Sequence, residues 1–384
     1  MKQFLKDIAI IGAGQGAPQG EENYCNEGIP FVKAGNLQEL LDGKDISLIQ
    51  QVSEIVAKKH RLKLYSKGTI LFAKSGMSCM KGYVYVLPQD AYVVSHLACI
   101  TPNEQISEYL RYYFLYHKPN QLVKDASYPS ISLTDIGNLE IDMKSVAERT
   151  AIVNELNLLD SIISLRQREL QKLDDLIKAR FVEMFGDENN SKNLPVIKIQ
   201  DVADVQVGVV IKPAQYYTDE ANGTKAFRSL NIGEMHIKDS DWVFFNDEGQ
   251  KKNSKSILRA NDLVIVRSGA PGTACVITKE YEGANAIDVI IAHPDMDKVN
   301  PLYLCAFTNY PHGKRQINEG TGGAAQQHFN VGKYKEMDLI YPQKHEQDEF
   351  VAFVKQVDKS KSVIQKSLEE TQLLFDSLMQ EYFG

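Results

Sequence analysis

The dipeptide Phe185-Gly186 occurs again as Phe383-Gly384, and it closes two copies of one sequence unit. The residues that precede it match at the same offset of 198 positions (383 − 185), as Asp160 matches Asp358. A unit of this length is far longer than a solenoid repeat of roughly 20–50 residues. The chain is therefore predicted to contain a duplicated domain, and such a duplication suggests a molecule that reads two copies of something.

Earlier parts of the unit recur as well. Lys74-Ser75-Gly76 matches Arg267-Ser268-Gly269 at an offset of 193 (267 − 74), and Asp7-Ile8-Ala9 matches Asp201-Val202-Ala203 at an offset of 194 (201 − 7). Because the offset then rises to 198, the second copy carries a net insertion of a few residues between its Arg-Ser-Gly segment and its end.

The bulk composition indicates packed globular domains. The chain has 384 residues, of which 43% are hydrophobic and 24% are charged, and this length is typical of two or three domains. No stretch approaches the roughly 18–20 apolar residues that a membrane-spanning helix needs, and the N-terminus lacks a signal-peptide pattern. We therefore expect a cytoplasmic protein.

The acidic charge balance limits the possible partners. A net charge of −7 argues against a nucleic-acid binder that works alone, since such domains are usually basic. It argues less strongly against a binder that borrows phosphate contacts from a partner, because most non-specific affinity comes from Lys and Arg facing phosphates.

Each unit is predicted to begin with a strand-rich part. Residues 65–73 indicate a turn that enters a short apolar strand, and residues 260–266 repeat this pattern. Tyr83–Leu87 is rich in residues that favour strands. A helix is expected at 104–116, with 301–308 as its counterpart in the second unit.

Each unit is predicted to end in a long helix. Apolar residues at alternating steps of three and four form the a/d seam of a coiled coil, and neither helix contains Gly or Pro between Ser145 and Phe185 or between His345 and Phe383. The seam residues are Leu156, Leu159, Ile163, Leu170, Leu173 and Ile177 in the first helix, and Val354, Val357, Ile364, Leu368, Phe375 and Leu378 in the second.

A helix with a single apolar stripe needs a partner. The simplest partner is the helix of the other copy in an antiparallel pair, and the alternative is that each helix packs on its own globular domain. The first arrangement predicts an α+β fold with a pseudo-twofold internal duplication. Two similar α/β domains at 1–144 and 191–342 are then separated by two long antiparallel coiled-coil helices at 145–190 and 343–384.

The glycine-rich stretch Ile8–Ala17 looks like a dinucleotide-binding turn. That chemistry needs a helix directly after the glycines and an acidic residue about 20 positions later, but Pro18 and Gly20 follow here. The aligned segment Val205–Val210 has lost the glycine pattern. A strand that ends in a flexible loop is therefore favoured over a cofactor site.

Motifs of catalysis and metal binding are missing from the sequence. The chain has neither a phosphate-binding Gly-x-x-x-x-Gly-Lys-Ser/Thr motif nor the Asn/Asp-Pro-Pro-aromatic tetrapeptide of amino-methyltransferases. His96, His293 and His328 are scattered, and each is interpreted as structural or surface. The five cysteines are odd in number and lack metal-ligand spacing, which favours reduced thiols. We therefore expect a non-catalytic chain without a metal site.

Polar residues suited to DNA occur at three matching places in the two copies: first residues 29–37 and 225–232, second residues 74–76 and 267–269, and third residues 127–131 and 322–329, where the copies share position but not chemistry. Cations can grip guanine or phosphate, Asn and Gln fit adenine, and Gly allows a close backbone approach. Taken alone, such residues are more often solvated surface or turn formers. The candidate DNA-binding residues are Lys33, Asn36, Lys74, Ser75, Gly76, Lys81, Tyr128 and Ser130 in the first copy, and Arg228, Ser229, Asn231, Arg267, Ser268, Gly269, Thr273, Gln326, Gln327 and His328 in the second.

Together these features give the whole chain a family resemblance. The helix openings Ala147–Val153 and His345–Val351 and the helix ends Arg180–Gly186 and Asp376–Gly384 resemble those of the specificity (S) subunit of Type I restriction-modification systems. One departure is that the first helix opening lacks the proline that the second keeps at Pro342.

The resemblance implies a function and a set of partners. The domains at 1–144 and 191–342 would be target recognition domains, each reading one half of a split, asymmetric site in double-stranded DNA, and the helices would fix the spacer between the halves. Two methyltransferase subunits would supply S-adenosylmethionine and adenine-N6 methylation. Two motor-nuclease subunits, which use ATP and Mg, would join when the system also cleaves. The chain itself would hold no cofactor and catalyse nothing.

Three alternatives stay open from the sequence. The chain could be a two-headed scaffold that binds something other than DNA. It could be a nucleotide-dependent enzyme that uses the Gly12–Gly16 loop. It could also be the specificity subunit of a related methylation-only or phage-exclusion system, which only its partners would define.

Overall fold

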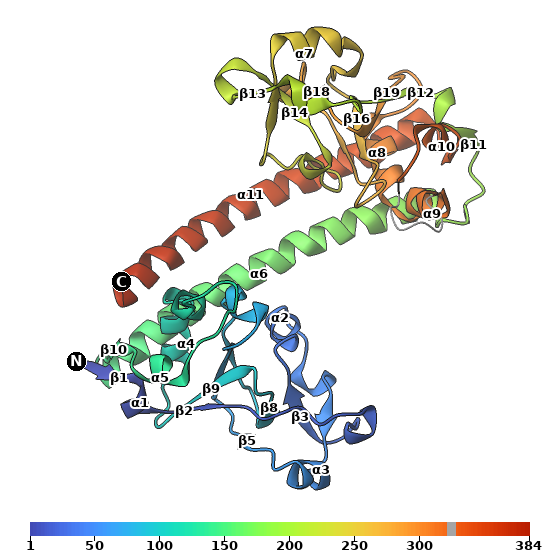
Figure 1. Ribbon diagram of the computed structural model, residues 1–384. Coiled ribbons are helices and arrows are strands. Elements are labelled where there is room, and N and C mark those ends of the chain that lie inside the picture. The colour runs from blue at the N-terminus through green and yellow to red at the C-terminus, as the bar shows by residue number, and fades with distance from the viewer. Residues whose placement is uncertain (321–327) are drawn as a thin grey trace. The chain divides into compact units, whose positions relative to one another are not determined.

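The computed structural model describes residues 1–320 and 328–384, and these residues form two compact units. Unit 1 comprises Met1–Arg166 with Ser367–Gly384, and unit 2 comprises Gln167–Lys366. Each unit therefore contains one strand-rich part together with one half of each of the two long helices (Figure 1). The domain boundaries predicted from the sequence lie at the ends of these helices and stay a prediction.

Unit 1 is built on two four-stranded sheets and a two-stranded ribbon. The first sheet has the strand order β2-β9-β6-β7, the second has the order β4-β3-β8-β5, and β1 pairs with β10. Its strands are β1 (Lys2–Phe4), β2 (Ala9–Ala13), β3 (Ile29–Val32), β4 (Gln51–Val52), β5 (Leu64–Tyr65), β6 (Ile70–Ala73), β7 (Tyr85–Val86), β8 (Ala91–Val93), β9 (Leu97–Pro102) and β10 (Glu140–Asp142). Its short helices are α1 (Leu5–Ile8), α2 (Asn36–Leu41), α3 (Glu54–Lys59), α4 (Ser107–Tyr116) and α5 (Leu133–Gly137).

Unit 2 repeats this plan. Its sheets have the orders β12-β19-β16-β17 and β13-β15-β14-β18, and β11 pairs with β20. Its strands are β11 (Val196–Lys198), β12 (Ala203–Val207), β13 (Tyr217–Thr218), β14 (Thr224–Phe227), β15 (Val243–Phe245), β16 (Leu263–Val266), β17 (Ala274–Val276), β18 (Asn285–Ala286), β19 (Val289–Pro294) and β20 (Asp338–Ile340). Its short helices are α7 (Asp247–Lys252), α8 (Pro301–Asn309), α9 (Pro311–Gly320) and α10 (Val331–Lys335).

The two units share pairing details that confirm the duplication. The second sheet contains a parallel pair in both units, β3 with β8 and β14 with β18. All other neighbouring strands described within the four-stranded sheets are antiparallel. The helix predicted at 104–116 is α4, and its predicted counterpart is α8. Only Tyr85–Val86 of the strand expected at 83–87 is extended in a ladder.

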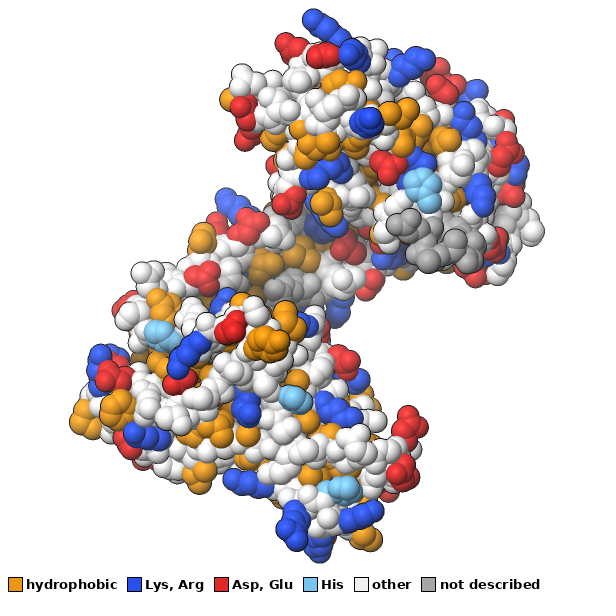
Figure 2. Space-filling model, in the orientation of Figure 1, with side chains coloured by type: hydrophobic (Ala, Val, Ile, Leu, Met, Phe, Trp, Pro, Cys, Tyr) orange, Lys and Arg blue, Asp and Glu red, His pale blue; other side chains and the backbone are white. Residues whose placement is uncertain are grey.

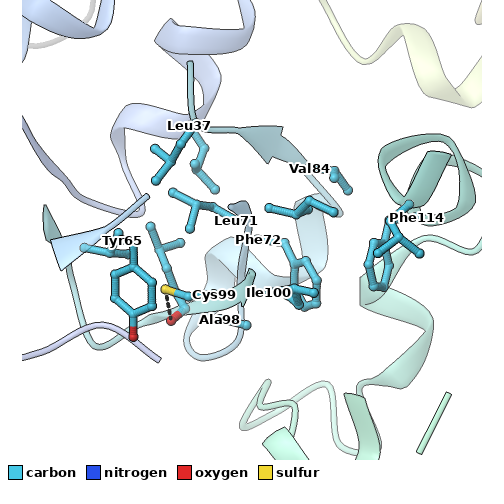
Figure 3. Packing of buried hydrophobic residues seen from close by; sticks show 14 of the residues in the cluster. Leu37, Tyr65, Leu71, Phe72, Val84, Ala98, Cys99, Ile100 and Phe114 are labelled. Carbon is cyan, nitrogen blue, oxygen red and sulfur yellow. Dashed lines mark hydrogen bonds between the residues drawn. The ribbon is translucent and has the colours of Figure 1, made fainter. Parts of the chain in front are cut away.

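The sheet core of unit 1 is covered on both faces (Figure 3). Phe72 of β6 packs on Phe114 of α4 with ring centroids 5.1 Å apart, while Leu71 points toward Leu37 of α2. All four residues of β6 are buried as a result. A strand buried on both sides reads as a continuous apolar run rather than an alternating one, which explains the apolar segment seen in the sequence.

The long helices α6 (Val146–Phe185) and α11 (Lys344–Phe383) run antiparallel within each unit. In unit 1 the Tyr382 hydroxyl donates to Glu155 at 2.7 Å, so the end of α11 lies beside the beginning of α6. In unit 2 Arg180 pairs with Glu349 at 3.0 Å, so the end of α6 lies beside the beginning of α11. The antiparallel pairing predicted from the sequence is confirmed.

The predicted seam residues face inward in this pairing. Each of the twelve is buried or half-buried. The helices also pack on the strand-rich part of unit 1. The ring centroid of Tyr112 in α4 lies 6.1 Å from that of Phe375 in α11, and the Tyr112 hydroxyl donates to Asn157 of α6 at 2.8 Å. Both helices therefore contact the globular part of unit 1, so pairing and packing on a domain occur together.

The glycine-rich stretch is a strand followed by a loop, as favoured from the sequence. Residues Ala9–Ala13 form β2, and Gly14 follows it against the backbone of β8. A Cβ on Gly14 would collide with the carbonyl of Val93, and a Cβ on Gly208 would collide with the carbonyl of Ala286. The interpretation that the second copy has lost the glycines is wrong at this position, since Gly208 keeps the one close approach that the fold needs.

No helix in the described part of the chain combines the length and the apolar character needed to cross a membrane. The cysteines are thiols, and burial raises the pKa of Cys99 and of Cys275 to about 12. Such thiols stay protonated and unreactive near neutral pH.

Candidate nucleic-acid interface

The first matching place is a turn after β3 in unit 1 and after β14 in unit 2. The Asn36 side chain accepts a hydrogen bond from the Lys33 amide at 2.9 Å, and the Asn231 side chain accepts one from the Arg228 amide at 2.9 Å. Both asparagines therefore form the turn. Asn231 is also 0% exposed, so its amide serves the fold and is closed to a ligand in this structure.

The cations of these turns are held beside the turn. The Lys33 ammonium donates to Gln50 at 2.5 Å and lies 4.5 Å from the centre of the Tyr24 ring. The Arg228 guanidinium donates to the backbone carbonyl of Asp241. Both side chains are half-buried, whereas Ser229 is exposed. The first matching place thus offers a pre-positioned cation in each unit.

The second and third matching places, treated separately in the sequence, come together in space. Ser75 forms an isolated antiparallel bridge with Ser130, and Ser268 forms the same bridge with His328. We call Ser75 and Ser268 the framework serines. In each unit the amide of the residue after the bridge, Ile131 or Phe329, donates at 2.8 Å to the carbonyl of the residue before the framework serine. One polar cluster per unit results.

We define cluster 1 as Lys74, Ser75, His96 and Ser130. The Ser75 hydroxyl lies 2.7 Å from Nδ1 of His96, and the Lys74 amide donates to the His96 carbonyl at 2.9 Å. His96 and Ser130 are exposed, while Lys74 and Ser75 are half-buried. Cluster 1 therefore presents a cation, hydroxyls and an imidazole at the end of β6.

We define cluster 2 as Arg267, Ser268, Asp288 and His328. The Ser268 hydroxyl lies 2.7 Å from Nδ1 of His328, and Arg267 pairs with Asp288 at 2.8 Å. Arg267 also donates to Nε2 of His328. The two clusters occupy the same place on the fold but present different hydrogen-bonding groups.

The remaining predicted residues are distributed around these clusters. Gly76 and Gly269 adopt the left-handed backbone conformation, with φ of 76° and 86°, that favours glycine directly after each framework serine. Lys81 and Tyr128 are exposed in unit 1. Thr273 accepts from the Val266 amide and closes the β16–β17 hairpin. Gln326 and Gln327 lie outside the described residues.

Sequence reasoning missed two members of the clusters, His96 and Asp288. His96 ends the three-residue connection between β8 and β9, while Asp288 ends the two-residue connection between β18 and β19. Both residues directly precede the equivalent strands β9 and β19, at an offset of 192 (288 − 96), which is one less than the offset of 193 that relates Ser75 to Ser268. The extra residue before β9 is the only sequence signal, and it becomes visible once the strands are paired.

The serine–histidine pair of cluster 2 differs from a catalytic pair. A serine and a histidine at hydrogen-bond distance resemble a nucleophile and its base, but the imidazole of His328 also faces the Arg267 guanidinium. Among the described residues, no group of three or more His, Cys, Asp or Glu side chains could hold a metal ion.

The surface charge is mixed. On the face shown in Figure 2, Lys and Arg side chains are interspersed with Asp and Glu over both units. This pattern agrees with the net charge of −7 and differs from the continuous basic surface of a domain that holds DNA alone.

The fold and the clusters define a class of protein: a duplicated binding protein with one polar cluster per unit and a shared pair of long helices. The family of the Type I restriction modification DNA specificity domain matches this chain twice, at residues 1–175 and 185–372. The chain belongs to that family.

Individual relatives agree with this assignment. The MjaIX specificity subunit, from a Type I restriction enzyme of Methanocaldococcus jannaschii, is 31% identical over 194 residues, which cover 50% of this chain and 40% of that protein. The StySPI specificity subunit of Salmonella potsdam is 21% identical over 388 residues, which cover 93% of this chain and 81% of that protein. The first of these matches thus spans less than half of its relative.

A solved structure supports the fold. The crystal structure of a Type I restriction-modification S subunit from M. genitalium matches with a TM-score of 0.58 at 14% identity, covering 100% of this chain and 96% of that one. At this identity the likeness concerns the fold alone.

Proposed function

We propose that this chain is the DNA sequence-specificity subunit of a Type I restriction-modification complex and that each unit reads one half of a bipartite, asymmetric site. The observation that carries the proposal is the bridge beside each framework serine. The same backbone position holds Ser130 in unit 1 and His328 in unit 2. An equal framework with unequal hydrogen-bonding groups is what two different half-sites require, because base pairs differ in the donors and acceptors that they present.

The long helices are proposed to set the spacer between the half-sites. Each contains 40 residues, which corresponds to about 60 Å at ~1.5 Å per residue. One turn of B-DNA is ~34–36 Å, so rods of this length are suited to half-sites separated along the duplex. Matched insertions of one helical turn in α6 and α11 should change the spacer and leave both half-sites intact. Methylation at the original spacing by such a folded variant would contradict this role.

Partner subunits are proposed to dock on the outer faces of these helices. Leu165 and Val363 are 57% and 71% exposed and are related by the offset of 198 (363 − 165). Leu176 and Leu374, related in the same way, are 46% and 50% exposed. Because each of these two pairs places one exposed apolar residue on α6 and one on α11, this part of the helix surface suits two copies of one partner.

By family resemblance, this partner is a methyltransferase subunit that brings S-adenosylmethionine and methylates adenine at N6. Two motor-nuclease subunits that use ATP and Mg are proposed to join when the system restricts. The chain itself supplies recognition and no reacting group. The acidic charge fits this division of labour, since the partners would then provide most of the phosphate contacts.

The deciding experiment is single-molecule sequencing of DNA from cells that express this chain with its neighbouring methyltransferase, scored for N6-methyladenine. We expect a split motif that disappears when this chain is omitted. The double variant Leu165→Glu and Val363→Glu tests the proposed docking surface. It should abolish methylation without unfolding either unit. Methylation that persists without this chain, or none from a demonstrably assembled complex, would favour a two-headed scaffold for another ligand. Methylation without cleavage would indicate a methylation-only system.

A further inference from the structure

Both units attach a histidine to the same framework serine, but they take it from different parts of the chain. Ser75 and Ser268 are equivalent at the offset of 193 (268 − 75). Each hydroxyl lies 2.7 Å from Nδ1 of an exposed histidine. His96 comes from the connection before β9, whereas His328 comes from the segment before α10. The same local arrangement is thus reached twice by non-equivalent residues.

In unit 2 the hydrogen bonds fix the roles of the imidazole and the guanidinium. Arg267 donates to Nε2 of His328, so Nε2 must be the acceptor nitrogen and Nδ1 must carry the proton that is donated to Ser268. Arg267 also donates to Asp288 at 2.8 Å and to the Phe329 carbonyl at 3.4 Å. Both ring nitrogens of His328 are therefore occupied inside the protein.

These contacts restrict the orientation of Arg267. A guanidinium has five N–H donors in a rigid plane, and three separate acceptors hold that of Arg267 in cluster 2. A plane held in this way loses little freedom when its other donors meet a ligand. This is the chemistry that recognises the O6 and N7 atoms of guanine.

In unit 1 the same place lacks the second anchor. Lys74 replaces Arg267, and no carboxylate stands where Asp288 lies. Nδ1 of His96 is held by Ser75, whereas its Nε2 has no hydrogen-bond partner among the described residues. The outer edge of an exposed and oriented imidazole is therefore presented beside Lys74.

We propose that the two units read DNA at this shared place with different groups, the His96 imidazole in unit 1 and the Arg267 guanidinium in unit 2. His96 contacts a base edge through Nε2, and His328 is the positioning residue that holds Arg267 toward its base. The ligand in both cases is a base-pair edge in the major groove. This inference rests on the proposed function and assigns a role to one residue of each half-site reader.

The test uses the assembled complex of this chain with its methyltransferase. The motif of the wild-type complex is first determined by methylation sequencing, and the variants His96→Ala, Arg267→Ala and His328→Ala are then compared with it. We expect His96→Ala to reduce discrimination about 10-fold at one base pair of one half-site, since Nε2 makes a single hydrogen bond to a base edge. Arg267→Ala and His328→Ala should relax one common base pair in the other half-site.

Two further comparisons separate positioning from contact. Arg267→Lys keeps the charge but loses the planar fork, so it should retain affinity while losing discrimination at that base pair. Ser75→Ala should weaken the same discrimination as His96→Ala, since it removes the group that holds the ring. The matched controls are His60→Ala in unit 1 and His236→Ala in unit 2, which should leave the motif unchanged.

The outcomes distinguish this inference from the proposed function. If the wild-type complex gives no split motif, the proposed function fails before any variant is considered. If it gives one and the motif is unchanged in His96→Ala and His328→Ala, the inference is wrong and the proposed function stands. If a variant loses all methylation, binding of the assembled complex to duplexes with each base at each position decides, and an equal loss for every base would overturn the base-reading role.

Discussion

The two units differ most plainly where each strand-rich part meets its long helix. Gln347 of unit 2 and Arg149 of unit 1 are equivalent at the offset of 198 (347 − 149). Gln347 is 0% exposed; it accepts from the Asn300 amide at 2.9 Å and donates to the Pro342 carbonyl at 3.0 Å. It therefore ties the beginning of α8 to the segment that enters α11.

Arg149 makes no comparable connection in unit 1. Its Nε and Nη1 atoms are buried without a hydrogen-bond partner, and Nη2 lies 3.6 Å from Glu104. Ile106 begins α4 without a side-chain cap, and a groove of about 1050 Å³ runs between this end of α4 and the first turns of α6. The same junction is thus held by two buried hydrogen bonds in unit 2 and by one weak ion pair in unit 1. We therefore expect unit 2 to be the more resistant to local opening.

The largest expected effect concerns the aromatic cluster at the end of α6. Phe181 is 0% exposed, and its ring centroid lies 5.0–5.7 Å from those of Phe185, Tyr303, Tyr310, His312 and Phe350. Phe181→Ala should cost roughly 3–5 kcal/mol of the stability of unit 2 because it leaves a large cavity. Native-state hydrogen exchange, resolved by unit, measures this loss. The equivalent Met379→Ala is the control, and it should open unit 1 instead.

The second prediction tests the contrast between Gln347 and Arg149 directly. Gln347→Leu leaves the buried Asn300 amide and Pro342 carbonyl without their hydrogen-bond partner, which should lower the stability of unit 2 by roughly 1–3 kcal/mol. Arg149→Leu removes only a weak ion pair, so its cost should stay within about 1 kcal/mol. Urea-induced opening of each unit, followed by hydrogen exchange, compares them. Equal losses in both variants would show that Arg149 is a structural connection like Gln347.

The third prediction tests what the units share. Gly14 and Gly208 each lie against a carbonyl of the neighbouring segment, so Gly14→Ala and Gly208→Ala should destabilise their own units by a similar amount, roughly 1–3 kcal/mol, through overpacking. Gly16→Ala is the matched control, because nothing lies within 4 Å of a Cβ at that position. Thermal unfolding of the three variants provides the comparison, and tolerance at only one of the two tight positions would contradict a common framework.

The sequence predicted those parts of the fold that depend on local periodicity. The long helices follow from apolar residues such as Leu156 and Val354 at steps of three and four, since neighbouring turns of one helix decide that pattern. The duplication followed from constant offsets. The parallel pair β3–β8 was not predicted, because it joins strands separated by several others and has no local signature.

The candidate site was predictable only in part, because contacts between distant segments leave no local pattern in the sequence. The framework serines Ser75 and Ser268 lie at a constant offset, so comparing the copies found them. His96 and His328 do not, and only the paired strands bring each beside its serine. Asn231 is of a residue type that can read bases, but its side chain is buried and hydrogen-bonded within its own turn. The sequence alone does not show that burial.

The smallest expected effect is a pH dependence of the stability of unit 2, which unit 1 should lack. His312 is 2% exposed and packs 5.4 Å from the Phe181 ring, and burial lowers the pKa of this imidazole below its ordinary value of 6.5 against smaller opposing effects of the backbone and the acidic side chains of Asp187 and Glu188. The folded unit therefore favours the neutral ring. Its contribution to stability is present above the pKa of the unfolded chain and is lost as the pH falls through the lowered pKa of the folded unit.

Unit 1 has no fully buried histidine, so it should lack this dependence. Between pH 7.5 and pH 5, after correction for intrinsic exchange rates, local opening of unit 2 should become easier relative to unit 1. His312→Phe should remove the difference, because a neutral ring of similar shape has no proton to gain. A relative opening that does not change with pH in the wild-type chain, or that changes equally in His312→Phe, would assign the asymmetry of the units to the Gln347 connection alone.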